Sequence, residues 1–181
     1  MEKKITKKAI DFFSMEAAIK AVTDAPGFKF QILLAKNEKV LKSELEIIRE
    51  KSKACEEFEE AQKGAEEIRK KFSDKNDDGT PKIITEMNNG RPIQKYDIPE
   101  SKLEELKTEF EKYWDEDLTK EAREKQQKIY EDYNTYITTE DLTLNLFTIP
   151  MECVPEEYFA KEEHKDKLKE FVNACFELIE E

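Results

Sequence analysis

The run Asp74–Gly79 (DKNDDG) has the residue types of a calcium-binding loop. Its oxygen ligands at the first, third and fifth positions, with glycine at the sixth, match the first half of a helix-loop-helix site. The second half departs from that pattern, because Pro81 stands at the eighth position and Thr85 at the twelfth, where a bidentate glutamate is needed. Glu86 comes one residue too late. We interpret the run as a polar loop leaving a helix, with cation binding as the open alternative.

Catalytic, zinc-binding and phosphate-binding sites have little support in the sequence. His164, the one histidine, lies among charged residues and is expected to be exposed, whereas a catalytic imidazole is partly buried and oriented. Cys55, Cys153 and Cys175 are widely spaced in apolar settings, which predicts buried thiols in a reducing compartment rather than disulfides or a zinc site. The four glycines stand alone, so no phosphate-binding loop is predicted. We expect no enzymatic activity, no cofactor and no metal centre.

The charge of the chain limits the classes of partner. Its formal net charge of -12 disfavours nucleic-acid binding, which depends on cationic side chains that displace counterions. Mimicry of nucleic acid is the less favoured alternative, because the acidic residues are interleaved with 31 Lys and Arg, as on a solvated helix face. Paired carboxylates occur throughout the chain and therefore do not indicate an active site.

Aromatic residues are the remaining candidates for partner contact. The second half of the chain holds Tyr113, Trp114, Tyr130, Tyr133 and Tyr136 on or beside one predicted helix. Tyrosine and tryptophan are enriched at binding hot spots, but the helical spacing of the tyrosines favours packing against another helix. Trp114 lies beside that stripe, so packing and partner contact are equally favoured. The candidate partner-binding residues are Trp114, Tyr113, Tyr130 and, at a predicted hairpin tip, Asn89 and Arg91.

Long helices are expected to position these residues. Charged residues make up 41% of the chain, and apolar residues recur every three or four positions. A first helix is predicted from just after Thr6 to the stop at 24–27, and a single long helix from 28 to about 72. A second long helix is predicted from about 99 to 136, with a bend near Asp117. At 1.5 Å per residue these two would be ~65 and ~55 Å long, and they are expected to pair antiparallel.

Two segments favour strands. Ile83–Thr85, the Asn89-Gly90 turn and the alternation that follows predict a β-hairpin at 82–98, and Leu142–Leu146 alternates as a further strand. A last helix carries an inner apolar face that consists of Leu168, Phe171, Val172, Cys175, Leu178 and Ile179.

The predicted fold class is mainly α with minor β. We expect a single domain over 1–181, in which 28–136 form a helical stalk with the β-hairpin 82–98 at its tip. Residues 1–27 and 137–181 would form a compact helical base that carries one further strand. No segment approaches the ~20 apolar residues of a membrane span, and no apolar stretch follows the basic residues of 1–8, so we expect a cytoplasmic protein without membrane contact.

The order of elements resembles a family of small bacteriophage-encoded proteins of unknown function. The resemblance covers about 28–149 and rests on Leu34–Asn37 (LAKN) before a Glu/Lys helix, the turns Asp78-Gly79 and Asn89-Gly90, Lys102–Leu106 (KLEEL) and a late apolar strand. The chain departs from the pattern in its longer second helix and in 115–131. The resemblance implies a phage or prophage origin and supplies no functional residue.

These observations lead to one hypothesis and one alternative. We expect a phage-derived accessory protein that binds a protein partner stoichiometrically in the host cytoplasm, as an inhibitor or modulator of a host or defence protein. The acidic surface, the projecting hairpin and the lack of a recognisable active site motivate this hypothesis. The alternative is a virion structural or assembly component, in which the long apolar stripe serves self-association.

Overall fold

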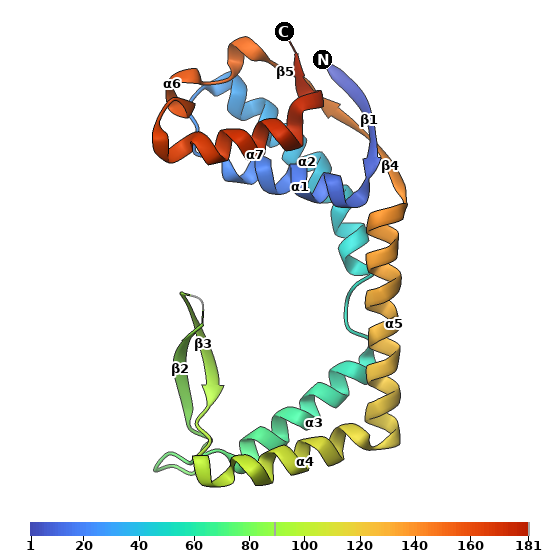
Figure 1. Ribbon diagram of the computed structural model, residues 1–181, viewed down its shortest axis with the longest axis vertical. Coiled ribbons are helices and arrows are strands. Elements are labelled where there is room, and N and C mark those ends of the chain that lie inside the picture. Colours follow the sequence, from blue (N-terminus) through green and yellow to red (C-terminus); the bar gives the residue numbers. More distant parts are fainter. Residues whose placement is uncertain (89, 181) are drawn as a thin grey trace. The chain divides into compact units, whose positions relative to one another are not determined.

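The computed structural model describes residues 1–88 and 90–180 (Figure 1). It is 65% helical with small two-stranded sheets, which confirms the mainly α class with minor β. By contact the chain forms two compact units, Met1–Lys53 with Tyr130–Glu181, and Ala54–Ile129. This grouping differs from the predicted stalk and base, since residues 28–53 belong with the chain ends in the first unit.

The first unit holds the main apolar core. Its elements are β1 (Glu2–Lys8), α1 (Ala9–Ala21), α2 (Phe28–Glu50), β4 (Asp141–Phe147), β5 (Ile149–Pro150), α6 (Glu156–Phe159), α7 (Lys165–Cys175) and β6 (Ile179–Glu180), together with short 3-10 turns at Met151–Cys153, Glu162–His164 and Phe176–Leu178. Helix α1 packs against α2 and α7 (Figure 1). At their centre the ring of Phe30 meets those of Phe171 and Phe159 edge to face, with centroids 5.8 and 6.4 Å away.

Strand β1 corrects the prediction that residues 7 and 8 already belong to the first helix. It pairs antiparallel with β4, from Glu2 opposite Phe147 to Lys8 opposite Asp141. Within β1 only Ile5 is buried, at 2% exposure, opposite the buried Leu144. The other positions are mostly lysine, so the apolar alternation that marks a strand is missing from its sequence.

The single long helix predicted over 28–72 is wrong, because the chain leaves the helix between α2 and α3 (Glu56–Phe72). At the end of α2, the Ser52 backbone N–H and hydroxyl both donate to the Arg49 carbonyl, at 3.0 and 2.8 Å. Cys55 is then extended, with ψ 154°. The apolar residues keep helical spacing across this break, and periodicity therefore did not reveal it. The bend predicted near Asp117 is confirmed, since α4 (Leu103–Asp115) and α5 (Asp117–Thr139) are separated by the extended Glu116.

In the second unit α3 runs antiparallel to α4 and to the beginning of α5. Phe58 packs on Trp114 with ring centroids 6.2 Å apart, and further along α3 the Lys71 ammonium lies 3.1 Å from a carboxylate oxygen of Glu109. At the other end Lys125 of α5 pairs with Glu57. The predicted antiparallel pairing is therefore present within this unit. Its apolar core is small, since Ala61, Ala65, Phe72 and Ala122 are its buried hydrophobic residues among those described.

The predicted β-hairpin is confirmed as β2 (Ile83–Asn88) and β3 (Arg91–Tyr96), between α3 and a 3-10 turn at Glu100–Lys102 (Figure 1). Its register runs from Ile83 opposite Tyr96 to Asn88 opposite Arg91. At its base the Asp74 N–H donates to the Asp97 carbonyl at 2.8 Å, and the Tyr96 hydroxyl donates to Glu66 of α3 at 2.8 Å. These bonds attach the hairpin to the helix pair.

Candidate protein-binding surfaces

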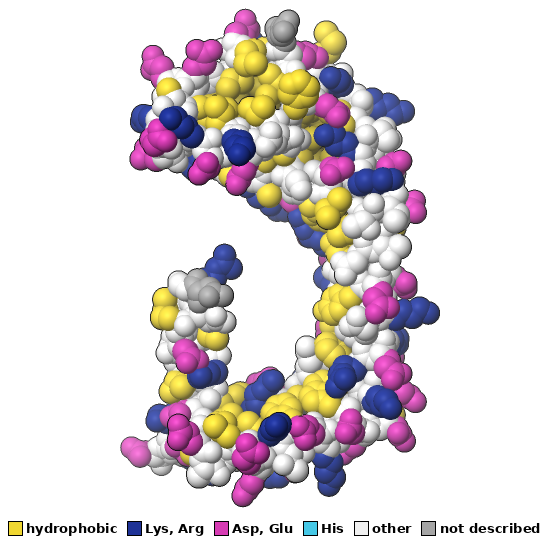
Figure 2. All heavy atoms as spheres, in the orientation of Figure 1, with side chains coloured by type: hydrophobic (Ala, Val, Ile, Leu, Met, Phe, Trp, Pro, Cys, Tyr) yellow, Lys and Arg dark blue, Asp and Glu magenta, His cyan; other side chains and the backbone are white. Residues whose placement is uncertain are grey.

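An apolar groove lies on the surface of the first unit. It has a volume of about 530 Å³ and is lined by Met151, Val154, Glu156, Phe159, Ala160, Leu168, Phe171, Val172, Phe176 and Ile179. Met151 is 49% exposed and Phe176 is 71% exposed. Figure 2 shows hydrophobic side chains gathered on this face, over α7 and the segment before it. The groove offers apolar surface to water in a chain that is otherwise rich in charge.

Helix α7 forms one wall of the groove because it is apolar on two sides. Phe171 and Cys175 are fully buried in the core. Leu168, Val172 and Phe176 follow one another at four-residue intervals and line the groove together with Phe171. The predicted inner face is confirmed for Phe171, Cys175 and Leu178, which are buried, and for Leu168 and Ile179, which pack against the core. Val172 is half-buried and lines the groove. The sequence indicates this second apolar side, because the apolar positions around α7 form an arc wider than a stripe that faces only the core.

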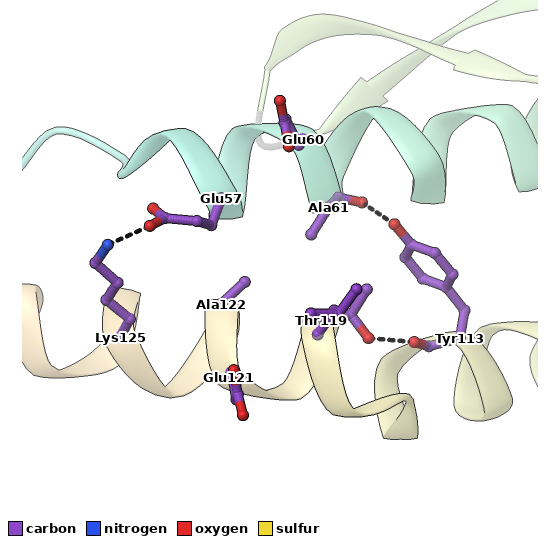
Figure 3. Close-up of a pocket in the computed structure, with 9 residues that line it drawn as sticks. Glu57, Glu60, Ala61, Tyr113, Thr119, Glu121, Ala122 and Lys125 are labelled. Carbon is purple, nitrogen blue, oxygen red and sulfur yellow. Dashed lines mark hydrogen bonds and ion pairs between the residues drawn. The ribbon is translucent and has the colours of Figure 1, made fainter.

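A smaller groove lies between α3 and α5 in the second unit. It has a volume of about 360 Å³ and is lined by Glu57, Glu60, Ala61, Tyr113, Leu118, Thr119, Glu121, Ala122 and Lys125. Figure 3 shows Ala61 and Ala122 pointing toward each other across the gap. The Tyr113 hydroxyl donates to the Ala61 carbonyl at 2.8 Å at one end, and Lys125 pairs with Glu57 at the other.

The carboxylate of Glu57 in this groove is held in its ionised form. The hydrogen bond from Lys125 lowers the pKa of Glu57, and the same bond raises the pKa of Lys125. Glu60 and Glu121 form no salt bridge within the described residues. Leu118 at the rim is 81% exposed. In Figure 3 the side chains of Glu60 and Glu121 do not point into the gap, so small apolar side chains line the space between the helices.

The structure uses two of the predicted partner-binding residues for internal packing. Tyr113 and Trp114 are half-buried, and their rings contact each other with centroids 5.4 Å apart. This matches the packing interpretation for Tyr113, which also lines the groove. Tyr130 is 43% exposed and belongs to the first unit, and Arg91 is exposed on β3. Asn89 lies outside the described residues.

The loop at 74–79 is organised by its own hydrogen bonds. Oδ1 of Asp78 accepts from the Thr80 backbone N–H at 2.9 Å and from the Thr80 hydroxyl at 2.6 Å, which lowers the pKa of Asp78. The Asn76 amide donates to the Thr80 hydroxyl oxygen at 3.0 Å. Among the described residues no group of three or more His, Cys, Asp or Glu is arranged to hold a metal ion.

The single histidine is less exposed than predicted. His164 stacks on Tyr158 with ring centroids 3.9 Å apart, and its side chain is 15% exposed. Packing on an aromatic ring covers it in spite of its charged neighbours in sequence. Of the cysteines, Cys175 is buried and burial raises the pKa of its thiol to about 12, whereas Cys55 and Cys153 are only half-buried.

Comparison with protein-family models, curated proteins and solved structures finds no match. No helix among residues 1–88 and 90–180 has the length and apolar character needed to cross a membrane. The two grooves are therefore interpreted from their geometry and charge alone.

Proposed function

We propose that the protein works by binding another protein stoichiometrically, with the apolar groove of the first unit as its docking face. The exposure of Met151 and Phe176 at this groove carries the proposal. Apolar side chains gathered on the surface of a charged protein mark interaction sites, because burying them against a partner removes them from water.

The shape of the groove favours a helical segment of the partner. Leu168, Val172 and Phe176 present an apolar stripe about two helical turns long, and residues of the 151–160 segment form the opposite wall. Amphipathic helices bind such grooves by inserting side chains that recur every three or four residues. Glu156 is the one charged residue in the lining, so apolar contact would supply most of the affinity.

The biological setting that we propose follows the resemblance to small bacteriophage proteins. In that setting the protein is an accessory factor that inhibits or modulates a host or defence protein. A position of its gene among small early phage genes would support this setting, and a position among tail or capsid genes would contradict it.

Affinity purification from bacterial cells that produce the tagged protein tests the docking face. We expect one protein to be retained at fixed stoichiometry by the wild type and lost with Phe176→Asp. Ile47→Asp is the matched control, because Ile47 is a 62% exposed apolar residue of the same unit outside the groove lining. Equal retention by both variants would contradict the proposal. A stable symmetric oligomer in light scattering, broken by Phe176→Asp, would show that the groove serves self-association instead.

A further inference from the structure

We propose that the outer edge of β2 pairs with the same edge of a second copy of this chain, which joins the two-stranded sheets of both copies into one antiparallel sheet. This edge belongs to the second unit, and the inference holds whether or not the apolar groove of the first unit binds a protein. It follows from the hydrogen bonding of the hairpin, from the sequences of its two strands and from its charge.

The hairpin has little cover of its own. Ile84 and Tyr96 are half-buried, whereas every other residue of β2 and β3 is exposed. Ile83 is 55% exposed and Met87 is 65% exposed. A two-stranded hairpin is at best marginally stable in water, and further strands or a covering layer supply the burial that it lacks. Although its base is bonded to α3, the hairpin would therefore gain stability from an added strand.

The register identifies the backbone groups that are free to pair. At the base of the hairpin the Asp97 N–H donates to the Lys82 carbonyl at 2.9 Å, so the hydrogen-bonding side of Lys82 faces β3. These sides alternate along an antiparallel strand, and the even-numbered residues of β2 therefore bond to β3. The N–H and C=O groups of Ile83, Thr85 and Met87 point away from β3. No other strand among residues 1–88 and 90–180 pairs with them (Figure 1).

The two edges of the hairpin differ in their protection. On β3, Pro92 has no N–H to donate, and Arg91 and Lys95 place charge along the strand. Strand β2 reads IITEMN and has no proline and one charged residue, Glu86. Because proline and lysine on an edge strand oppose pairing with other chains, β3 is the protected edge. The structure leaves β2 as the edge that can accept a strand.

The outer edge of β2 is complementary to itself. In an antiparallel pair centred on Thr85, each Ile83 lies opposite the Met87 of the other copy, and about six N–H···O bonds join the copies. Glu86 then lies opposite Ile84, so the carboxylate does not meet its own copy. A pair centred on Glu86 would place two carboxylates opposite each other, which is unfavourable. A pair centred on Ile84 would place Met87 beyond the end of the other strand.

The charge of the hairpin permits this contact. The net charge of -12 makes most surfaces of the chain repel a second copy. The hairpin and the residues that flank it differ, because Lys82, Arg91 and Lys95 outnumber Glu86 and Asp97. Two copies can therefore approach through their hairpins without bringing acidic surfaces together.

Sedimentation equilibrium and amide hydrogen exchange followed by NMR test the dimer on the full chain. One short strand from each copy buries little surface, so we expect a reversible dimer with a dissociation constant in the micromolar range or above. At high protein concentration the amides of Ile83, Thr85 and Met87 should exchange more slowly, and those of Gln94 and Tyr96 should not change. A chain that stays monomeric up to millimolar concentration would overturn the proposal, as would a dimer without this protection.

A matched pair of variants locates the contact. Thr85→Lys places two lysines opposite each other at the centre of the interface and should weaken the dimer by several-fold. Gln94→Lys makes the same charge change opposite Thr85 on β3, and it should alter the dissociation constant by less than about twofold. Both residues are exposed on edge strands, where lysine is well tolerated, so the hairpin should stay folded. Equal effects of the two variants would overturn the proposal.

A proline pair tests the backbone bonds directly. Thr85→Pro removes the central outward N–H of β2 and should abolish the dimer, whereas Gln94→Pro removes an outward N–H of β3 and should leave it intact. Slow exchange of the Ile84 and Glu86 amides in each variant would show that the hairpin is still formed. Phe176→Asp should leave this dimer unchanged, so the two proposals can fail separately. A dimer broken by Phe176→Asp and not by the Thr85 variants would place self-association in the apolar groove and overturn the pairing of β2.

Discussion

Gly64 of α3 lies against the ring of Tyr113 of α4. A Cβ atom at this position would lie 2.1 Å from the Tyr113 hydroxyl oxygen and 2.8 Å from Cζ of the same ring. The sequence marks Gly64 as a weak point of a helix, since glycine costs about 1 kcal/mol relative to alanine there. The structure explains it as the space into which the Tyr113 ring fits.

Gly64→Ala should therefore destabilise the second unit by about 1–2 kcal/mol, because the phenol must move and its hydrogen bond to the Ala61 carbonyl is strained. In a Tyr113→Ala background the same change should instead stabilise by about 1 kcal/mol, through helix propensity alone. A double-mutant cycle in urea, followed by Trp114 fluorescence, measures both values. Equal effects in the two backgrounds would show that the ring does not require the glycine.

Glu16 is a buried carboxylate whose charge the first unit compensates. Its side chain is 4% exposed and pairs with Arg49 of α2 and with Lys20, the latter at 2.8 Å. Burial raises the pKa of Glu16, but the hydrogen bonds from Lys20 and Arg49 outweigh it and hold the pKa below its ordinary value of 4.5. The ionised side chain therefore stabilises the folded state above pH 4.5, and this contribution is lost as the pH falls through the lowered value.

Glu16→Gln should reduce the free energy of unfolding by about 1–3 kcal/mol at pH 7, because it removes charge-assisted hydrogen bonds. The difference from the wild type should shrink at pH values below 4.5. Urea unfolding followed by circular dichroism at a series of pH values measures it. A difference that does not vary with pH would contradict the pairing.

At the scale of elements, one amide joins α2 to β4. The fully buried Asn37 donates from Nδ2 to the Phe147 carbonyl at 2.9 Å, and its Oδ1 accepts from the Phe147 N–H at 2.7 Å. These are the two bonds that a neighbouring strand would make. The Asn37 side chain thus satisfies both backbone groups of Phe147 in place of a neighbouring strand.

Asn37→Leu should destabilise the first unit by about 2–4 kcal/mol, because it leaves the N–H and the carbonyl of Phe147 without their partners. Asn145→Leu is the matched control, since Asn145 is exposed on the same strand and should change stability by less than about 0.5 kcal/mol. Thermal unfolding of the two variants checks this difference. Similar losses in both would assign the effect to the strand rather than to the amide.

At the scale of the whole molecule, the two compact units differ in their cores. The first buries many large apolar side chains, including Phe12, Phe30, Phe171 and Leu146. In the second, Phe72 is the one large apolar side chain that is buried among the described residues. Because apolar burial is the main favourable term in folding, the second unit should be the less stable of the two.

We expect unfolding in two steps that different probes resolve. Trp114 is the only tryptophan of the chain and lies in the second unit, so its fluorescence should change at a lower urea concentration than the main loss of circular dichroism. Leu146→Ala removes a fully buried side chain of the first unit and should reduce the free energy of unfolding of that unit by about 2–5 kcal/mol. The midpoint of the fluorescence change should stay the same. Coincident transitions would show one cooperative unit.

The elements that rest on local signals were predictable. The hairpin at 83–96 follows from its alternation and its Asn-Gly turn, and the strand at 141–147 from Leu142, Leu144 and Leu146. The aromatic residues pointed to a segment that lines the groove between α3 and α5, where Tyr113 contributes internal packing.

The sequence alone determined that the chain is mainly helical, acidic and provided with one hairpin, because composition, periodicity and turn residues act over a few neighbouring positions. Only the tertiary structure decided that residues 2–8 form a strand, that 28–72 breaks at 51–55, and that one side of α7 opens into a groove. The strand and the groove depend on contacts between residues far apart in the chain, and the pattern of any single segment does not contain its partner.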